Sequence, residues 1–297
     1  MADQNTNWSW LEYSDTVIEL ARQKKSKLEM YCIHDTMTSD VKGIPSYTAN
    51  IDVTEKTALN QRIVPTQSQQ TRRKLTAKTY YIAMAYDLDA IGELKLDPSS
   101  YDVTYMLEAI ARKKDKSIAD SLYATVYEGE AMDSSVSFAT DGGKTVDATS
   151  GLTYEKFLEI TRNFNSVNIG LDNKEFIGLG ITEQEHSDLM QELEFTSHDF
   201  TRLNAIDENG YERLNGYSLI KFASAETPYP ILPVASSTRD CFAFANGFMR
   251  LATKIALRTK EESIPLTLNS KMVTYSLSYG CVRQDGRKIQ KVQTTAI

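Results

Sequence analysis

Apolar residues recur at three- and four-residue spacing most clearly from Ser100 to about Glu130. This spacing places apolar side chains on one face of a helix, and no glycine or proline interrupts it before Gly129. We therefore predict a helix of about 30 residues, roughly 45 Å long at ~1.5 Å per residue. A polar patch from Lys113 to Lys116 interrupts the apolar stripe, so burial there is expected to be partial.

Shorter helices are predicted from the same spacing and from capping residues at their starts. Ser9 with Glu12, and Thr182 with Glu185, have capping-box spacing, and Thr153 can also begin a helix. The predicted helices cover residues 13–31, 87–94, 154–164 and 183–193.

Strands are predicted where β-branched and aromatic residues gather between turn residues. They cover residues 80–86, 176–181, 217–222, 272–280 and 288–292. Asn246-Gly247 between two apolar runs is typical of a tight β-hairpin. Asp141-Gly142-Gly143-Lys144 also favours a hairpin turn, because no GxxxxGK[ST] phosphate loop is present.

The region from 40 to 80 has a different composition. It is rich in Thr, Gln and Asn, and short β-prone pieces at 47–53 and 61–64 flank a polar middle. A two-stranded ribbon of this kind is marginal in water by itself. We therefore expect either a disordered segment or an arm that becomes ordered against another subunit, and the β-pattern favours the arm.

Composition excludes several classes of protein. The formal charge is 33 − 40 = −7, which argues against a surface that coats nucleic acid, since phosphate binding needs clustered Lys and Arg. No apolar run approaches the ~20 residues of a membrane helix, and no secretory signal is visible. The three distant cysteines form neither a disulfide framework nor a zinc pattern, so we expect synthesis in a reducing cytoplasm. They are Cys32, Cys241 and Cys281.

No constellation for catalysis, cofactor binding or metal binding can be assembled. The only histidines, His34, His186 and His198, lie outside any HExxH or similar frame. Gly178 and Gly180 lack the third glycine of a dinucleotide loop, because Glu183 stands in its place. We therefore predict no enzyme, no cofactor and no metal. The basic run Arg22, Lys24, Lys25 and Lys27 indicates either a contact with a polyanion or, more simply, a solvated helix face.

Five passages carry a family resemblance through their order along the chain. They are Ala21-Arg22-Gln23-Lys24-Lys25-Ser26-Lys27-Leu28, the passage 71–76 with Tyr80-Tyr81-Ile82-Ala83, the long helix from Ser100, the helix-strand-helix block 151–182, and 275–281 with Arg287-Lys288-Ile289. In this order they resemble the major capsid proteins of tailed double-stranded DNA bacteriophages, which have the Hong Kong 97-like fold.

The resemblance implies an α+β fold with defined regions. These would be an N-terminal arm (1–45), an extended β-hairpin loop (46–85), a peripheral domain (86–165 and 255–297) with the long helix as its spine, and an axial domain (166–254). The axial domain could carry Asn246-Gly247 in a hairpin.

The resemblance also implies a function in assembly. The chain would form hexamers and pentamers of an icosahedral head in the host cytoplasm, with possible separate scaffolding, portal and decoration proteins and no membrane. Arg72, Arg73 and Lys74 become candidates for contacts between subunits, with a solvated basic turn as the alternative. Arg22, Lys24, Lys25 and Lys27 become candidates to face packaged DNA. The alternatives are a tail or decoration protein, or an uncharacterised cytoplasmic enzyme. Deleting residues 46–80 is expected to leave a soluble core that forms no shells.

Overall fold

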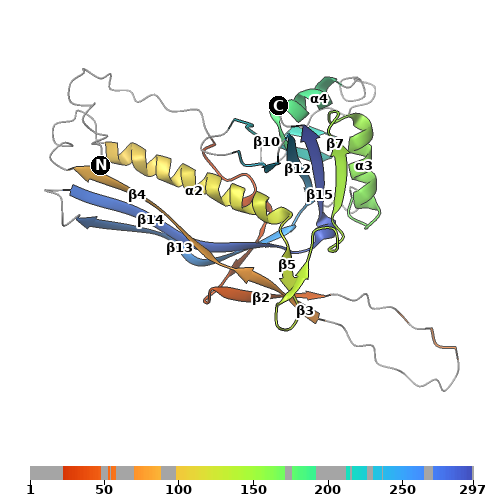
Figure 1. Ribbon diagram of the computed structural model, residues 1–297, viewed down its shortest axis with the longest axis horizontal. Coiled ribbons are helices and arrows are strands. Elements are labelled where there is room, and N and C mark those ends of the chain that lie inside the picture. Colours follow the sequence, from red (N-terminus) through yellow and green to blue (C-terminus); the bar gives the residue numbers. More distant parts are fainter. Residues whose placement is uncertain are drawn as a thin grey trace.

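The described chain is an α+β fold with three β-sheets and three α-helices (Figure 1). The α+β class predicted from the sequence is confirmed. The computed structural model describes residues 23–47, 53, 55–57, 70–87, 98–170, 176–191, 212–214, 216–225, 230–235, 237–263 and 270–295.

The first sheet, which we call the long sheet, has the order β1-β13-β14-β4. The predicted strands 80–86 and 272–280 are confirmed as parts of β4 and β14, which pair antiparallel. Of the predicted helix 87–94, Asp87 ends β4 and the remainder lies outside the described residues. The strands are β1 (Ile33–Thr36), β4 (Lys78–Asp87), β13 (Met249–Ser263) and β14 (Ser270–Arg283).

The predicted long helix lies along one face of the long sheet as α2 (Pro98–Leu122) (Figure 1). The Ser117 hydroxyl lies 2.9 Å from the Tyr279 hydroxyl, and the Tyr80 and Tyr279 rings pack 5.0 Å apart. The helix ends at Leu122, before the predicted Glu130, and Arg283 Nη1 donates to the carbonyls of Leu122 and Ala124 at 2.7 and 3.0 Å. These bonds satisfy acceptors that a helix end leaves unpaired.

The second sheet, the broad sheet, has the order β7-β15-β12-β8-β10-β9, with β11 paired to β12. The sheet extends beyond the predicted axial block 166–254. It also contains β7, which precedes that block in the sequence, and β15, which follows it, and these two strands pair in parallel. The strands are β7 (Lys144–Ala148), β8 (Ile177–Thr182), β9 (Glu212–Leu214), β10 (Tyr217–Phe222), β11 (Val234–Ala235), β12 (Thr238–Ala245) and β15 (Ile289–Thr295).

Two helices accompany the broad sheet, and both were predicted. In α3 (Tyr154–Asn165), Phe157 is buried and its ring meets the Tyr217 ring of β10 at 4.7 Å. Thr153 is the N-cap residue, although its hydroxyl makes no capping bond. In α4 (Glu183–Gln191), the capping-box carboxylate of Glu185 accepts the Thr182 backbone N–H at 2.8 Å. The rest of the predicted 183–193 helix lies outside the described residues.

Gly178 and Gly180 serve packing inside the broad sheet. A Cβ at Gly180 would lie 2.6 Å from the Phe242 ring, and one at Gly178 would lie 2.5 Å from the Phe244 ring. The two phenylalanines are their direct partners on β12. Their rings thus lie over the glycines and fill the space that side chains would have occupied.

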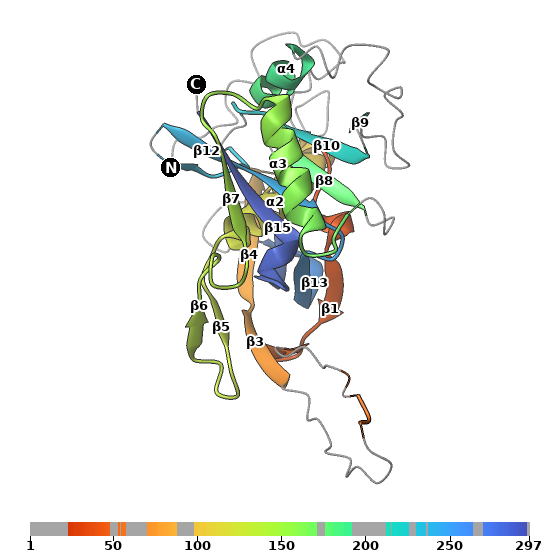
Figure 2. The ribbon, with the colours of Figure 1, turned by 90° about the vertical axis from the view of Figure 1, so that its right-hand side faces the viewer.

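The third sheet, the small sheet, has the order β2-β3-β5-β6 and lies at the opposite end of the molecule from α4 (Figure 2). β2 and β3 form an antiparallel ribbon that ends at the pair Tyr47 and Gln70, whereas β3 meets β5 only at Arg73 and Glu128. Val53 is not in a strand, and the predicted piece 61–64 lies outside the described residues. The strands are β2 (Val41–Tyr47), β3 (Gln70–Thr76), β5 (Val126–Glu128) and β6 (Ser134–Val136).

Both predicted hairpin turns are wrong. Asn246-Gly247 joins β12 of the broad sheet to β13 of the long sheet, and those strands do not pair. Here the Asn246 N–H donates to the Phe176 carbonyl and the Gly247 N–H to the Tyr31 carbonyl, so contacts distant in sequence hold the turn. Asp141-Gly142-Gly143-Lys144 likewise joins β6 of the small sheet to β7 of the broad sheet.

The segment 23–36, which we call the strap, also differs from prediction. Of the predicted helix 13–31, the part 23–28 is not helical and only Glu29–Tyr31 forms a 3-10 turn, η1. Residues 13–22 lie outside the described residues. The Lys27 and Leu28 backbone N–H groups donate to the Asp115 carboxylate of α2 at 2.9 and 3.2 Å. These side-chain acceptors replace the carbonyls that a helix would have supplied.

We predict that Gly180→Ala destabilises the subunit by about 1–3 kcal/mol, because the added methyl group overpacks the Phe242 ring. The measurement is the free energy of unfolding in urea. In a Phe242→Leu background the same change should cost clearly less, since the ring that it strikes is gone. Equal costs in the two backgrounds would contradict the assignment of the glycine to ring packing.

Candidate functional site

A buried group of four charged side chains lies where the three sheets meet. Its members come from β3, β5, the β6–β7 loop and the end of β14, and we call them the junction cluster. They are Arg73, Glu128, Asp141 and Arg283.

Asp141 is the centre of the junction cluster. Its Oδ2 accepts from Arg73 Nη1 at 3.0 Å and from Arg283 Nε at 2.7 Å. Arg73 Nη1 also donates to the Arg283 carbonyl at 3.1 Å, and its Nε pairs with Glu128. Two positive charges thus face two negative charges, which is the condition under which buried charges are tolerated.

Burial acts on these charges directly. The Arg283 side chain is 0% exposed, and that of Asp141 is 7% exposed. Burial by itself would lower the pKa of Arg73, but the hydrogen bond and charge of Asp141 and the charge of Glu128 outweigh it and raise the pKa. Arg73 therefore carries its positive charge at neutral pH and pairs with both carboxylates.

The three candidates for contacts between subunits lie on opposite faces of β3, because side chains alternate along a strand. Arg72 and Lys74 are exposed on one face of β3, and the Lys74 ammonium lies 5.9 Å from the Tyr127 ring centre. Arg73 points to the opposite face and makes its ion pairs inside its own chain. Arg72 and Lys74 therefore stay candidates for a contact with a neighbouring subunit, whereas Arg73 is engaged inside its own chain.

The basic run near the N-terminus divides in a similar way. Lys24 and Lys25 are exposed, and Arg22 lies outside the described residues. Lys27 is half-buried, with its ammonium donating to the Lys221 carbonyl at 2.5 Å and lying 5.3 Å from the Phe222 ring centre. It is thus bound to the broad sheet rather than fully solvated.

The part of the chain that the structure describes holds no cluster of metal-ligating side chains. His34 is exposed on β1, His186 Nε2 lies 3.2 Å from Glu212, and His198 lies outside the described residues. Burial raises the pKa of the Cys32 and Cys241 thiols. Both are thus protonated at neutral pH, which argues against a reactive thiolate.

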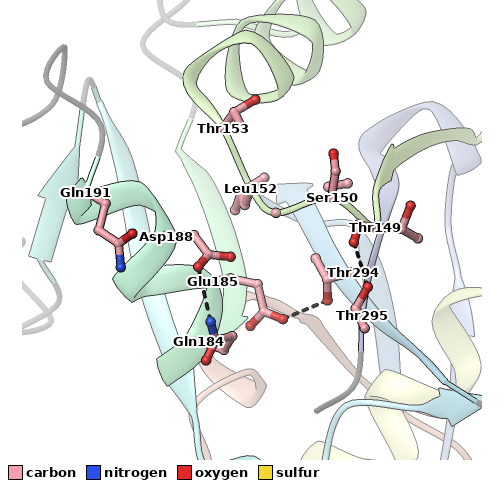
Figure 3. A pocket seen from close by; sticks show the side chains of 12 residues that line it. Thr149, Ser150, Leu152, Thr153, Gln184, Glu185, Asp188, Gln191, Thr294 and Thr295 are labelled. Atoms are coloured by element: carbon pink, nitrogen blue, oxygen red, sulfur yellow. Dashed lines mark hydrogen bonds between the residues drawn. The ribbon is translucent and has the colours of Figure 1, made fainter.

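A polar pocket of about 430 Å³ opens beside α4, at the end of the broad sheet (Figure 3). Two carboxylates line it, and both have partners. Asp188 accepts from the Gln184 amide at 3.1 Å, while Glu185 accepts from Thr182 and, at 2.6 Å, from the Thr294 hydroxyl, and lies 3.7 Å from Arg239. Burial would raise the pKa of Glu185, but these hydrogen bonds outweigh it and lower the pKa. The Thr294 and Glu185 residues are 3% and 1% exposed, and their hydrogen bond joins α4 to β15 inside the subunit.

Comparison with known proteins identifies the family. The sequence profile of a phage capsid protein family matches residues 6–296. The chain belongs to the phage capsid protein family. It is therefore a structural protein rather than an enzyme, and the predicted family is confirmed. No curated protein matches it by sequence.

Solved capsids share the fold of this capsid protein over nearly the whole chain. The capsid of cyanophage P-SCSP1u is similar with a TM-score of 0.71 and 11% identity, covering 96% of this chain and 93% of that chain. The mature capsid of bacteriophage PhiM1 gives 0.69 and 10%, covering 97% and 92%. The head of Helicobacter pylori bacteriophage KHP40 gives 0.69 and 8%, covering 99% and 96%. The fold is the Hong Kong 97-like fold that the resemblance implied.

The junction cluster, the strap carboxylate Asp115 and their partners were missed by sequence reasoning. The local signal for Asp115 is a single acid within Lys113-Lys114-Asp115-Lys116, a patch for which the sequence predicts only partial burial. Asp115 is in fact 0% exposed.

No described helix is long and apolar enough to cross a membrane.

We predict that Asp141→Asn lowers the free energy of unfolding by about 3–5 kcal/mol, the usual effect of breaking a buried ion pair. The neutral amide leaves Arg73 and Arg283 without a shared counter-charge, and urea denaturation measures the loss. Asp133→Asn, an exposed acid in the same stretch of chain, is the matched control and should change stability by no more than about 0.5 kcal/mol. Equal effects of the two substitutions would contradict the role of the junction cluster.

Proposed function

We propose that the chain is the major capsid protein of a tailed double-stranded DNA phage and assembles through its extended segments. The observation that carries this proposal is the attachment of the β2–β3 ribbon. Among the described residues, the ribbon joins the rest of the subunit only at its base, through the ladder pair Arg73–Glu128, the junction cluster, and Ile44 and Leu75 in a buried cluster with residues of β5, β13 and β14. A two-stranded ribbon gains stability mainly from what it packs on, so a neighbouring subunit is the natural partner.

The division into regions follows the sheets. Of the N-terminal arm (1–45), the part before Gln23 would reach a neighbouring subunit, since the strap and β1 are bound within their own subunit. The extended loop (46–85) would also reach a neighbour, with β4 staying in the long sheet of its own subunit. The long sheet and α2 would form the peripheral domain, and the broad sheet the axial domain, including β7 and β15. Hexamers and pentamers of such subunits would tile the shell, because head-to-tail contacts that close give rings.

Basic residues near the N-terminus and the net charge of the chain suggest how the subunit would meet packaged DNA. Arg22, Lys24 and Lys25 would face the packaged DNA, which they would contact without sequence preference. The net charge of −7 keeps most of the inner surface from adhering to the DNA. Scaffolding, portal and decoration proteins would be separate chains, and assembly would take place in the host cytoplasm before the subunit becomes part of the virion.

Electron microscopy of the expressed protein tests the proposal, and a hairpin variant sharpens it. Tyr47 and Gln70 are register partners, so an Asn-Gly turn can join them in place of residues 48–69. We expect closed shells from the wild-type chain and a folded subunit without shells from the variant, because the part that reaches a neighbour is gone. A wild-type chain that stays monomeric, or normal shells from the variant, would contradict the proposal.

A larger deletion would not give the same information. Removal of residues 46–80 takes away the buried Arg73 and Leu75 and part of β4, which pairs with β14. The sequence alone predicted a soluble core after this deletion, but with these contacts removed we expect the subunit not to fold. The Asn-Gly variant leaves the junction cluster intact.

We further predict that Arg72→Glu with Lys74→Glu reduces the yield of shells at least about tenfold, as expected for like charges placed at a contact. Circular dichroism of the free subunit should be unchanged, because both side chains are exposed. The matched control is Lys271→Glu, which reverses the charge of an exposed lysine on β14. Shell yield by sedimentation is the measurement, and an unchanged yield in the double variant would remove these residues from the contact.

A further inference from the structure

One buried carboxylate holds the root of the N-terminal arm. Asp115 lies on α2 and is 0% exposed. Its two oxygens accept four hydrogen bonds from the strap. The donors are the Gln23 side-chain amide, the Ser26 hydroxyl at 2.5 Å, and the backbone N–H groups of Lys27 and Leu28 at 2.9 and 3.2 Å.

Neighbouring side chains of α2 add to this anchor. Arg112 Nη1 donates to the Gln23 carbonyl at 3.1 Å, and Lys114 pairs with Glu29 at 2.7 Å. Leu28, between these contacts, is fully buried. One turn of α2 therefore binds the strap at both ends of the stretch from Gln23 to Glu29.

Burial of Asp115 is unfavourable by itself. Burial raises the pKa of Asp115, even though the hydrogen bonds from Ser26, Lys27, Gln23 and Leu28 act to lower it. An apolar residue would have filled this place in a helix packed only for stability. A carboxylate that accepts two consecutive backbone N–H groups instead specifies one conformation of the strap.

We propose that Asp115 is the positioning residue of the N-terminal arm, fixing the point and direction at which residues before Gln23 leave the subunit for shell assembly. This inference rests on the proposed function, because an arm matters only where subunits meet. It goes further by assigning the alignment of the arm to one carboxylate of its own subunit rather than to the neighbour.

The test compares Asp115→Asn with Asp120→Asn. Asp120 lies on the same helix with a 52% exposed side chain and pairs with Lys116, outside the anchor. The amide that replaces the Asp115 carboxylate can donate but not accept on one side, so it cannot serve all four donors. We expect amide exchange at Lys27 and Leu28 to speed up by about tenfold to a hundredfold, and trypsin to cut after Lys25 and Lys27 at a correspondingly higher rate.

Shell yield is the second readout, by electron microscopy and sedimentation. Asp115→Asn should give at least about tenfold fewer closed shells, while Asp120→Asn should match the wild type in exchange, proteolysis and yield. Ser26→Ala removes one donor to Asp115, together with the acceptor of the Glu29 N–H at 3.2 Å, and should give an intermediate effect. It also keeps the proposal testable if Asp115→Asn does not fold.

Two outcomes would overturn the inference. Protected amides at 27 and 28 in Asp115→Asn would show that the carboxylate does not hold the strap. Normal shells despite rapid exchange would show that the strap does not position the arm. Both results are distinct from a failure of the proposed function, in which the wild-type chain itself would form no shells.

Discussion

The Asp141 carboxylate, held between two arginines, is the constraint on which the architecture depends. Asp141 lies between the small and the broad sheet, Arg73 belongs to the small sheet, and Arg283 ends the long sheet. Arg283 also closes the carboxyl end of α2. A single anion therefore fixes three sheets and the end of the longest helix relative to one another. Hydrophobic contacts alone would allow those sheets to slide, because dispersion and burial have no direction.

The strap supplies the second connection between the same parts. It is bound to α2 through Asp115, its Tyr31 ring stacks on Phe176 at 4.4 Å beside the broad sheet, and β1 then joins the long sheet in parallel with β13. The connection from β14 to β15 also meets the Asn246-Gly247 turn, since the Gln284 N–H donates to the carbonyl of Phe248, which directly follows that turn. The body of the subunit is thus closed by side-chain and backbone contacts far apart in the sequence.

Local pattern predicted those elements whose partners are local. The periodicity of 154–164 and the aromatic and β-branched residues of 80–86 predicted α3 and β4, because such local signals suffice to define each element. Asn246-Gly247 failed as a hairpin because its chemistry specifies a reversal but not which sheet the next strand joins. Residues 23–28 failed as a helix because Asp115, 87 or more positions away, competes for their N–H groups. The junction cluster could not be predicted, since its four charges are spread from 73 to 283.

The single ladder pair between β3 and β5 has a mechanical consequence. The base of the ribbon is held by the Arg73 ion pairs and by Ile44 and Leu75, which are buried against β5, β13 and β14. The Arg73 contacts lead through Asp141 to Arg283, which donates to the Leu122 carbonyl at the carboxyl end of α2. In the proposed assembly, a load on the far end of the ribbon would reach the end of α2 through these contacts. A shell built from such subunits would share a local load among many of them.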